Sequence, residues 1–432
     1  MKRICVVGSG YVGLVTGSCL SDLGNEVICV DNDKDKIGAL KDLKMPIYEP
    51  GLEDIVKRNV KAGRLIFTTD IKQAVKKSEI IYIAVGTPPK ANGEADLSCV
   101  EDVSRDVAFN MDSYRLIVDK STVPVQTGQR VKETISRCLK NDIEFDVASN
   151  PEFLREGSAV DDFMQPDRIV IGVETERAAD LLKEVYGPFN STIIVTDMQS
   201  AELIKHAANS FLATKVSFVN ALSVICEMTG ADVDKVAEGM GMDKRIGSTF
   251  LKAGVGFGGF CFPKDLAAFV KIAEKLGYDF KLLKAVQEIN KTQKERFVKK
   301  IEHALWNVKG KTIAILGLSF KPNTDDVRFA PSIDIIQMLQ RDGAKINAYD
   351  PHAMDKMSKV LPKVKYCSSP YEAADGADAL VIITEWSEFK ELDLAKIKEL
   401  LNDPIIVDGR NVYDADTMRK LGFKYVCIGK KS

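Results

Sequence analysis

Residues 2–13 read KRICVVGSGYVG, and this stretch decides the fold. Its apolar run, residues 4–7, has the continuous hydrophobicity of a strand that is buried on both faces, and glycine-rich residues 8–13 follow directly. A helical stretch to Leu23 and a second strand, residues 27–30, come next, and Asp31 ends that strand. This order predicts a dinucleotide-binding unit, because the fingerprint follows a strand, opens a helix and precedes an acidic strand end.

Each of the three glycines of this turn has a different structural role. Gly8 permits the tight turn, Gly10 lets the backbone approach a pyrophosphate, and Gly13 allows the helix to pack closely on the strand. Asp31 would accept hydrogen bonds from the adenine ribose and repel a 2′-phosphate, which favours NAD over NADP. Lys36 is close enough in sequence to contact the ribose, although alone it reads as a solvated lysine. The alternative is a structural glycine turn in which Asp31 is only a cap.

The pattern of buried strands continues along the first 200 residues. Apolar runs recur at residues 80–85, 116–118 and 146–148. Such alternation predicts a parallel sheet with helices on both faces. The loops after these strands, residues 86–89, 121–124 and 150–157, should face one crevice at the carboxyl ends of the strands, although each alone could be an ordinary loop.

The middle of the chain differs in composition from the first 200 residues. Residues 201–228 contain no Gly or Pro and predict one long helix. Residues 239–259 hold seven glycines in twenty-one positions, a density that predicts neither helix nor strand. A second helical region, residues 266–308, follows.

The opening pattern then restarts at residues 311–317, KTIAILG, without the glycine fingerprint. We therefore expect an α/β protein with two Rossmann-like, doubly wound domains joined by a long central helix and a helical middle domain. The expected division is an NAD-binding domain at 1–200, a central helical domain with the cysteine loop at 201–309, and a second Rossmann-like domain at 310–432, which binds something other than a dinucleotide or lines the same cleft from the far side.

Composition excludes several classes of protein. The 432 residues carry a formal charge of -2, and near-neutrality argues against a nucleic-acid partner. No apolar run is long enough at the N-terminus for a signal sequence or membrane span. Nine cysteines and three histidines show no zinc-ligand spacing, so we expect no metal. Scattered cysteines without a signal peptide predict a reduced, cytoplasmic protein.

One cysteine has chemically active neighbours. Cys261 lies in residues 256–265, GFGGFCFPKD, where glycines let a substrate approach. Lys264 would lower the pKa of the thiol, and Asp265 would orient a water; the competing interpretation is a structural cysteine. Lys205 and Asn209 are one helical turn apart, so they share a face. The pattern leaves open whether Lys205 is solvated or buried and functional.

Several stretches together resemble the signatures of the UDP-glucose 6-dehydrogenases, within the nucleotide-sugar 6-dehydrogenase superfamily. The matching stretches are residues 10–13, 121–124, 150–157, 202–211, 244–265 and 317–328. The resemblance covers essentially the whole chain. It implies oxidation of the C6 alcohol of UDP-glucose to a carboxylate, with two NAD reduced, in a homodimer or higher homo-oligomer built on the long helix.

The resemblance also assigns roles to catalytic residues. Cys261 is the nucleophile that forms a thiohemiacetal and then a thioester. Lys205 is first the base and then a cation that stabilises the oxyanion, to which Asn209 donates a hydrogen bond. Asp265, with Thr122 and Glu156, holds and activates the hydrolytic water.

Binding residues follow from the same resemblance. Those implied for NAD are Gly8, Gly10, Tyr11, Val12, Gly13, Asp31, Lys36, Gly86, Thr87, Pro88, Ser121, Thr122, Glu156, Lys264 and Arg328. Those implied for the nucleotide sugar are Glu152, Phe153, Leu154, Arg155, Lys205, Asn209, Lys252, Phe257, Gly258, Lys321 and Arg410, with Arg245 reaching in from a neighbouring subunit.

Phe260 departs from the family pattern, which has a small residue such as Ser beside the nucleophile. A ring there would narrow the pocket or shift the sugar preference. The alternatives are therefore the same chemistry on GDP-mannose or a UDP-N-acetylhexosamine, a one-step hydroxyacid dehydrogenase, and a non-catalytic NAD-binding regulator. The last two do not explain why Lys205, Asn209, Cys261 and Asp265 occur together.

Overall fold

A computed structural model describes residues 1–431 of the chain. Its contacts divide it into two compact units. The first unit consists of Met1–Ala208 and Ala267–Tyr278, and the second of Asn209–Leu266 and Asp279–Ser432, of which Ser432 lies outside the described residues.

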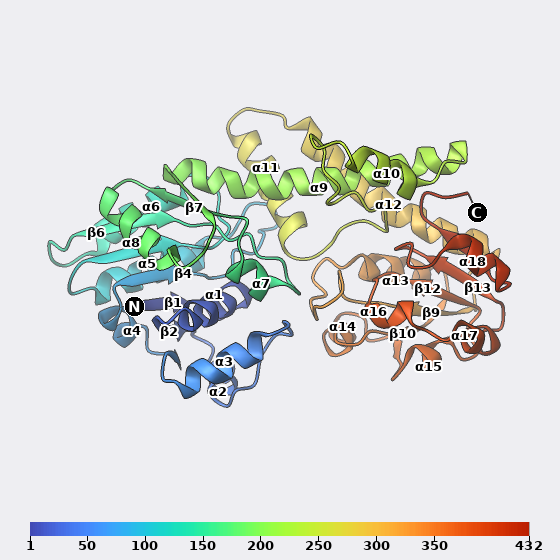
Figure 1. Cartoon of the computed structure of the whole chain (residues 1–432), viewed down its shortest axis with the longest axis horizontal. Helices are drawn as coiled ribbons and strands as arrows, with labels where there is room; N and C mark the ends of the chain where they lie inside the picture. The colour runs from blue at the N-terminus through green and yellow to red at the C-terminus, as the bar shows by residue number, and fades with distance from the viewer. Residues whose placement is uncertain (432) are drawn as a thin grey trace. The chain divides into compact units, whose positions relative to one another are not determined.

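The first unit is built on an eight-stranded sheet with the order β3-β2-β1-β4-β5-β6-β7-β8 (Figure 1). The strands are β1 Arg3–Val7, β2 Glu26–Val30, β3 Leu65–Thr68, β4 Ile80–Ile83, β5 Arg115–Asp119, β6 Phe145–Ser149, β7 Arg168–Val173 and β8 Thr192–Thr196. The helices are α1 Tyr11–Asp22, α2 Lys34–Lys41, α3 Leu52–Lys61, α4 Ile71–Lys77, α5 Ser98–Asn110, α6 Thr127–Cys138, α7 Ala159–Met164 and α8 Glu176–Tyr186.

Successive residues of the buried strands point to opposite faces of this sheet. Ile4 and Val6 of β1 join the core cluster that contains residues of α1 and α3. Cys5 and Val7 join the cluster that contains residues of α4, α5 and α6. Because both faces are covered, a strand here must be apolar at every position, and this explains the unbroken apolar run in the sequence.

The sheet is parallel, as the sequence predicts, except where β6 pairs with β7. Strands β1 to β6 pair in parallel, but β7 runs antiparallel to β6, with Ser149 opposite Gly172. The link from β6 to β7 carries only the loop at residues 150–158 and the short helix α7, and β7 lies beside the strand it follows. Pairing of β7 with β8 is parallel again.

The second unit contains a six-stranded parallel sheet with the order β11-β10-β9-β12-β13-β14. This order matches that of β3-β2-β1-β4-β5-β6, which is the Rossmann arrangement, so the prediction of two such folds is confirmed. The strands are β9 Thr312–Leu316, β10 Lys345–Tyr349, β11 Lys365–Tyr366, β12 Ala379–Ile382, β13 Ile405–Asp408 and β14 Lys424–Cys427. The helices are α13 Pro331–Arg341, α14 Met354–Val360, α15 Pro370–Ala374, α16 Ser387–Lys390, α17 Leu394–Leu400 and α18 Ala415–Lys420.

Four helices occupy the middle of the chain, with α9 as the long green helix in Figure 1. They are α9 Met198–Thr229, α10 Val233–Gly241, α11 Cys261–Lys275 and α12 Lys281–Leu305. The long helix is confirmed. The glycine-rich stretch was expected to be non-helical throughout, yet Gly239 and Gly241 end α10, where packing of Val233 and Ala237 outweighs the glycine cost. The second helical region is two helices, and the first starts at Cys261.

Helix α9 is the one helix in the described residues that is long and apolar enough to cross a membrane. The criterion is length and composition alone, and the core helices of soluble proteins satisfy it too. The three-part division at residues 200 and 309 stays a prediction.

Candidate active site

The glycine turn after β1 has the geometry of a dinucleotide site. Gly8 has φ +101°, a conformation that favours glycine, and a Cβ on Gly13 would lie 1.8 Å from the Gly8 carbonyl oxygen. Gly10 caps α1 without a side-chain hydrogen bond, so the free N–H groups of the first turn are left for an anion. These features fit the pyrophosphate of NAD.

The Asp31 carboxylate lies at the end of β2, where the ribose of NAD is expected. It accepts hydrogen bonds from the backbone N–H groups of Ser9 at 2.8 Å and Asp33 at 3.0 Å. Lys36 Nζ pairs with it at 2.9 Å. Burial opposes ionisation, but the hydrogen bonds from Lys36 and the two backbone groups outweigh it and lower the pKa of Asp31. The carboxylate is therefore charged at neutral pH and has acceptor capacity for ribose hydroxyls.

The loops after β4 and β5 are joined by hydrogen bonds. Ser121 Oγ donates to the Val85 carbonyl at 2.9 Å, and Thr87 Oγ1 donates to the Thr122 carbonyl at 2.9 Å. The structure thus brings together Gly86, Thr87, Pro88, Ser121 and Thr122, as the sequence predicts for loops at the carboxyl ends of neighbouring strands.

Glu49 ties the loop after β6 to the glycine fingerprint. Tyr11 donates its hydroxyl proton to Glu49, which also accepts from the backbone N–H groups of Gly157 at 2.6 Å and Ala159 at 2.7 Å. Glu156, beside Gly157, is buried. Sequence analysis missed Glu49, and only its predecessor in the chain, Tyr48, and a following proline mark the site as a turn.

Lys205 is buried, which settles the question that its helix pattern left open. Its Nζ pairs with Glu152 Oε1 at 2.9 Å, and both side chains are 4% exposed. Glu152 also accepts the backbone N–H of Leu154 at 2.6 Å. The ring of Phe153 lies 5.4 Å from Lys205 Nζ and 3.6 Å from the Arg168 guanidinium carbon. A buried lysine paired with a carboxylate is a suitable group for proton transfer.

Cys261 is the first residue of α11, and the charged residues after it form a hydrogen-bonded group in the second unit. Asp265 Oδ2 accepts a hydrogen bond from Asn209 Nδ2 at 2.6 Å, and its Oδ1 lies 2.6 Å from Lys264 Nζ. Phe257 and Phe262 pack here against Leu266. Asp265 is wholly buried, and Asn209 and Lys264 are polar partners of its carboxylate.

The glycine loop before Cys261 packs against the loop after β9. A Cβ on Gly258 would lie 2.3 Å from the Phe329 carbonyl oxygen, and one on Gly259, which has φ +80°, would lie 2.7 Å from the Phe320 ring. Larger residues would separate the two loops, so glycine is required for their close approach.

Phe260, the departure from the family pattern, has charged neighbours. Its ring centre lies 4.3 Å from the Arg328 guanidinium carbon and 5.4 Å from Lys264 Nζ. Arg328 also pairs with Asp326 at 2.6 Å. The ring therefore contacts two cations that the resemblance assigns to NAD.

Other predicted substrate residues lie in the loops that follow strands of the second sheet. Arg410 follows β13 and makes two hydrogen bonds of 2.6 Å to Glu385, which follows β12. Burial opposes ionisation of Glu385, but Arg410, and to a lesser degree Lys252, lower its pKa. Lys321 Nζ lies 5.6 Å from the Phe320 ring. Glu385 was missed, because one glutamate after an apolar run has no sequence signature.

Two predicted substrate residues have exposed side chains that pair with acidic neighbours in their own unit. The side chain of Arg245 is 89% exposed and pairs with Asp243 at 2.6 Å. That of Arg155 is 61% exposed and pairs with Asp162. Among the rest, the first unit holds the glycine fingerprint, the β4 to β6 loops and Lys205, and the second holds Asn209, Lys252, Phe257, Gly258, Cys261, Lys264, Asp265, Lys321, Arg328 and Arg410.

Among the described residues, no group of His, Cys, Asp and Glu side chains is arranged to hold a metal ion. A nucleotide-binding turn with a charged Asp31 defines a nucleotide-binding protein, and the buried Lys205 and the cysteine at the start of α11 are groups suited to an oxidoreductase.

The chain belongs to the UDP-glucose/GDP-mannose dehydrogenase family. The NAD binding domain of that family matches residues 2–190, its central domain residues 199–292, and its UDP binding domain residues 314–415. The family resemblance and the NAD cofactor predicted from the sequence are therefore confirmed.

Individual relatives match over the full length. The chain is 51% identical to UDP-glucose 6-dehydrogenase TuaD of Bacillus subtilis, covering 100% of this chain and 94% of the relative. It is 47% identical to the UDP-glucose 6-dehydrogenase of Rhizobium meliloti, with 99% of each covered. A solved UDP-glucose dehydrogenase from Pyrobaculum islandicum superposes with a TM-score of 0.94 at 38% identity, covering 100% of this chain and 98% of the other.

Proposed function

We propose that this protein is an NAD-dependent UDP-glucose 6-dehydrogenase, which oxidises the C6 alcohol of UDP-glucose to the carboxylate of UDP-glucuronate. The observation that carries the proposal is the arrangement at α11, where Cys261 opens the helix and Asp265, one turn later, is hydrogen-bonded to Asn209. Relatives 47–51% identical over at least 99% of the chain bear this activity in their names.

The residues of the first unit that would hold NAD are those of the glycine turn, Asp31 and the β4 and β5 loops. When bound, NAD accepts a hydride from C6 in each of two oxidations. The protein supplies the helix N-terminus for the pyrophosphate and the charged Asp31 for the ribose. Lys264 and Arg328, which flank Phe260, are proposed as further NAD contacts.

Lys205 has two roles in the proposed reaction. As a neutral amine it accepts the proton of the C6 hydroxyl, and as a cation it then stabilises the oxyanion that forms when a nucleophile adds to the aldehyde. Glu152, 2.9 Å from its Nζ, orients the amine. The amide of Asn209 has two N–H bonds, and since one is directed to Asp265, the other is left for the same oxygen.

Cys261 adds to the aldehyde because a free aldehyde is a poor hydride donor, whereas a thiohemiacetal alkoxide expels hydride readily. The product on the sulfur is a thioester, which water hydrolyses. Asp265 is proposed to hold and activate this water together with Thr122 and Glu156. Because the Asp265 carboxylate is buried, its electrostatic interaction with the water is stronger than it would be in solvent.

The nucleotide sugar is proposed to bind at the loops of the second sheet and at residues 152–155. Its diphosphate needs cations, and Lys252, Lys321, Arg410 and the exposed Arg245 supply them. Glu385 holds the Arg410 guanidinium in a fixed plane through two hydrogen bonds, so this residue is oriented before the ligand arrives.

The alternative is the same chemistry on GDP-mannose or a UDP-N-acetylhexosamine. The chain also superposes, with a TM-score of 0.88 at 27% identity, on a UDP-D-ManNAc dehydrogenase from Pyrococcus horikoshii. Phe260 is the residue that keeps this alternative open, because it stands next to Cys261 in the chain, where the family has a small residue such as Ser.

A panel of nucleotide sugars tests the substrate. Purified protein is mixed with UDP-glucose, GDP-mannose or a UDP-N-acetylhexosamine and NAD, and NADH absorbance is followed to completion. We expect UDP-glucose to have the highest kcat/KM and to yield two NADH per sugar. One NADH per sugar would contradict the four-electron reaction, and a higher kcat/KM for another sugar would move the assignment. Phe260→Ser run on the same panel shows whether the ring sets the preference.

We propose a homodimer, or a higher oligomer containing it, that forms through helix α9. Alternate spacings of three and four residues place Phe211, Thr214, Phe218, Ala221, Ile225 and Met228 along one stripe. Phe211 is 67% exposed, Phe218 54%, Ile225 57% and Met228 83%, far more apolar surface than a solvated helix presents. This spacing suits a second copy of the same helix.

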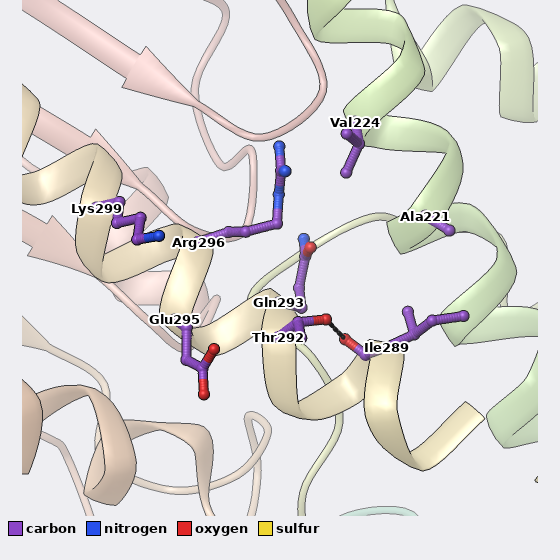
Figure 2. Close-up of a pocket in the computed structure, with 8 residues that line it drawn as sticks. All are labelled: Ala221, Val224, Ile289, Thr292, Gln293, Glu295, Arg296 and Lys299. Atoms are coloured by element: carbon purple, nitrogen blue, oxygen red, sulfur yellow. Dashed lines mark hydrogen bonds between the residues drawn. The ribbon is translucent and has the colours of Figure 1, made fainter. Parts of the chain in front are cut away.

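A hollow of about 490 Å³ lies next to this stripe and extends the same surface. Figure 2 shows Ala221 and Val224 of α9 across from α12, which contributes Ile289, Thr292, Gln293, Glu295, Arg296 and Lys299. Its apolar wall and polar far side are typical of the core and rim of an interface.

Charging the stripe is expected to separate the subunits. A carboxylate at Phe218→Glu would be buried at the centre of the helix pair, so we expect monomers by light scattering after gel filtration. Val360→Glu is the matched control, because Val360 is similarly exposed, at 45%, but lies on α14. A Phe218→Glu protein of unchanged mass would contradict the proposed interface.

We also propose that the protein works in the cytoplasm. All nine cysteines are free thiols, and the proposed reaction requires Cys261 to remain reduced.

A further inference from the structure

Lys120 is a buried cation at the end of β5 that the proposed reaction does not use. The residue is 5% exposed. In the described part of the chain its hydrogen bonds both end on Asn150, at 3.1 Å to Oδ1 and 3.2 Å to the carbonyl oxygen. Both acceptors are neutral, so the carboxylate of Glu152 acts on the charge of Lys120 without being one of its hydrogen-bond acceptors.

Asn150 is itself held on several sides. Its Nδ2 donates to the Val170 carbonyl at 2.8 Å, and its Oδ1 accepts from the Tyr186 hydroxyl at 2.5 Å. Tyr82 extends this chain of hydrogen bonds through Tyr186. Since Asn150 stands two residues before Glu152, Lys120 fixes the start of the segment that carries the partner of Lys205.

The charges of Lys120, Glu152 and Lys205 influence one another. Burial lowers the pKa of Lys120 to about 8; Glu152 opposes this effect, and Lys205 adds to it. Interaction between two charges is reciprocal, so protonated Lys120 disfavours the protonated form of Lys205 by the same free energy. At pH 7 a lysine with such a pKa is roughly nine-tenths protonated.

A base must lose its proton before it can act. The ion pair with Glu152 by itself favours the protonated form of Lys205, in which the amine cannot accept a proton from an alcohol. A second cation nearby opposes this preference, and because Lys120 is buried, solvent screens its charge only weakly.

We propose that Lys120 is a positioning residue for the oxidation. It anchors Glu152 through Asn150, and it supplies a buried positive charge that makes the neutral form of Lys205 accessible. This inference rests on the proposed role of Lys205 as the base.

The pH dependence of kcat/KM tests the inference. Lys120→Gln and Lys120→Met remove the charge, so Lys205 should hold its proton to higher pH. We expect the acidic limb of the kcat/KM profile to move to higher pH by about one unit. At pH values below the limb, kcat/KM should then be about tenfold lower than in the wild type, and above the limb the two values should converge.

Three other variants separate charge from structure. Tyr186→Phe removes a hydrogen bond to the same Asn150 without changing a charge, so its limb should stay in place. Lys120→Arg keeps the charge and should return the limb toward its wild-type position. Asn150→Asp places a carboxylate against Lys120, which compensates its charge, so the acidic limb should move to higher pH as it does in Lys120→Gln and Lys120→Met. This variant provides a second test if the two Lys120 variants do not fold.

Two results would overturn the inference. One is an unmoved limb in the neutral variants and in Asn150→Asp, and the other is an equal shift in Tyr186→Phe. Lys205→Met tells the two proposals apart. If it still transfers the first hydride, the role of Lys205 in the proposed function is wrong. If it is inactive while the limb of the Lys120 variants stays in place, only the inference about Lys120 fails.

Discussion

Cys261→Ala is expected to lose UDP-glucuronate formation by about 10⁴-fold, because no other group in the proposed site can carry the covalent intermediate. Cys261→Ser retains an oxygen nucleophile, but a hydroxyl is far less nucleophilic than a thiol at neutral pH. That variant should stall before acid release. Both variants should still bind NAD and the sugar, because they keep the proposed binding residues. They also keep Lys205 and Asn209, on which the first oxidation depends.

The measurement is acid formation by chromatography beside NADH absorbance, with mass spectrometry of the protein during turnover. Wild-type enzyme should carry sugar-nucleotide mass on the peptide that contains Cys261, and the alanine variant none. Cys99→Ser is the control, because Cys99 is an exposed thiol on α5, outside the proposed site. Full activity of Cys261→Ala would overturn the mechanism.

Gly13→Ala is expected to destabilise the first unit by about 3 kcal/mol, the upper end of overpacking costs, since a Cβ there meets a backbone atom. The new methyl would lie 1.8 Å from the Gly8 carbonyl oxygen and 3.2 Å from Ala84 Cβ. Helix α1 must therefore move away from β1, and the turn between them must distort. Thermal unfolding should show a lower melting temperature.

Gly10→Ala is the matched control for this clash. A Cβ on Gly10 has no neighbour within 4 Å, and Gly10 has φ -74°, which alanine adopts without strain. The melting temperature should stay within a degree, while the Kd for NAD rises by about tenfold, because the methyl projects where the pyrophosphate approaches. An unchanged Kd in Gly10→Ala, measured by calorimetry, would contradict the assignment of this turn to NAD.

The NAD-binding turn was predictable because its determinants are local. The conformation of Gly8, the close packing of Gly13 and the acidic end of β2 are properties of one strand, turn and helix. The second Rossmann order was predictable for the same reason, since buried parallel strands are apolar at every position.

Long-range contacts explain what the sequence did not reveal. The reversal of β7 depends on where a strand pairs after a short link, and the helical Gly239 and Gly241 depend on packing that outweighs a weak propensity. Glu49, Lys120 and Glu385 act on residues 108, 30 and 25 positions away, at which distance spacing carries no signal.

The amino-acid sequence alone predicted the class of fold, the preference for NAD and Cys261 as the proposed nucleophile among nine thiols, because each prediction depends on residues that are close together in the chain. Only the tertiary structure shows that Lys205 forms a buried ion pair with Glu152 and that Lys120 is buried nearby. Burial and charge partners set the proton affinity of a lysine, and both come from segments that meet only when the chain folds.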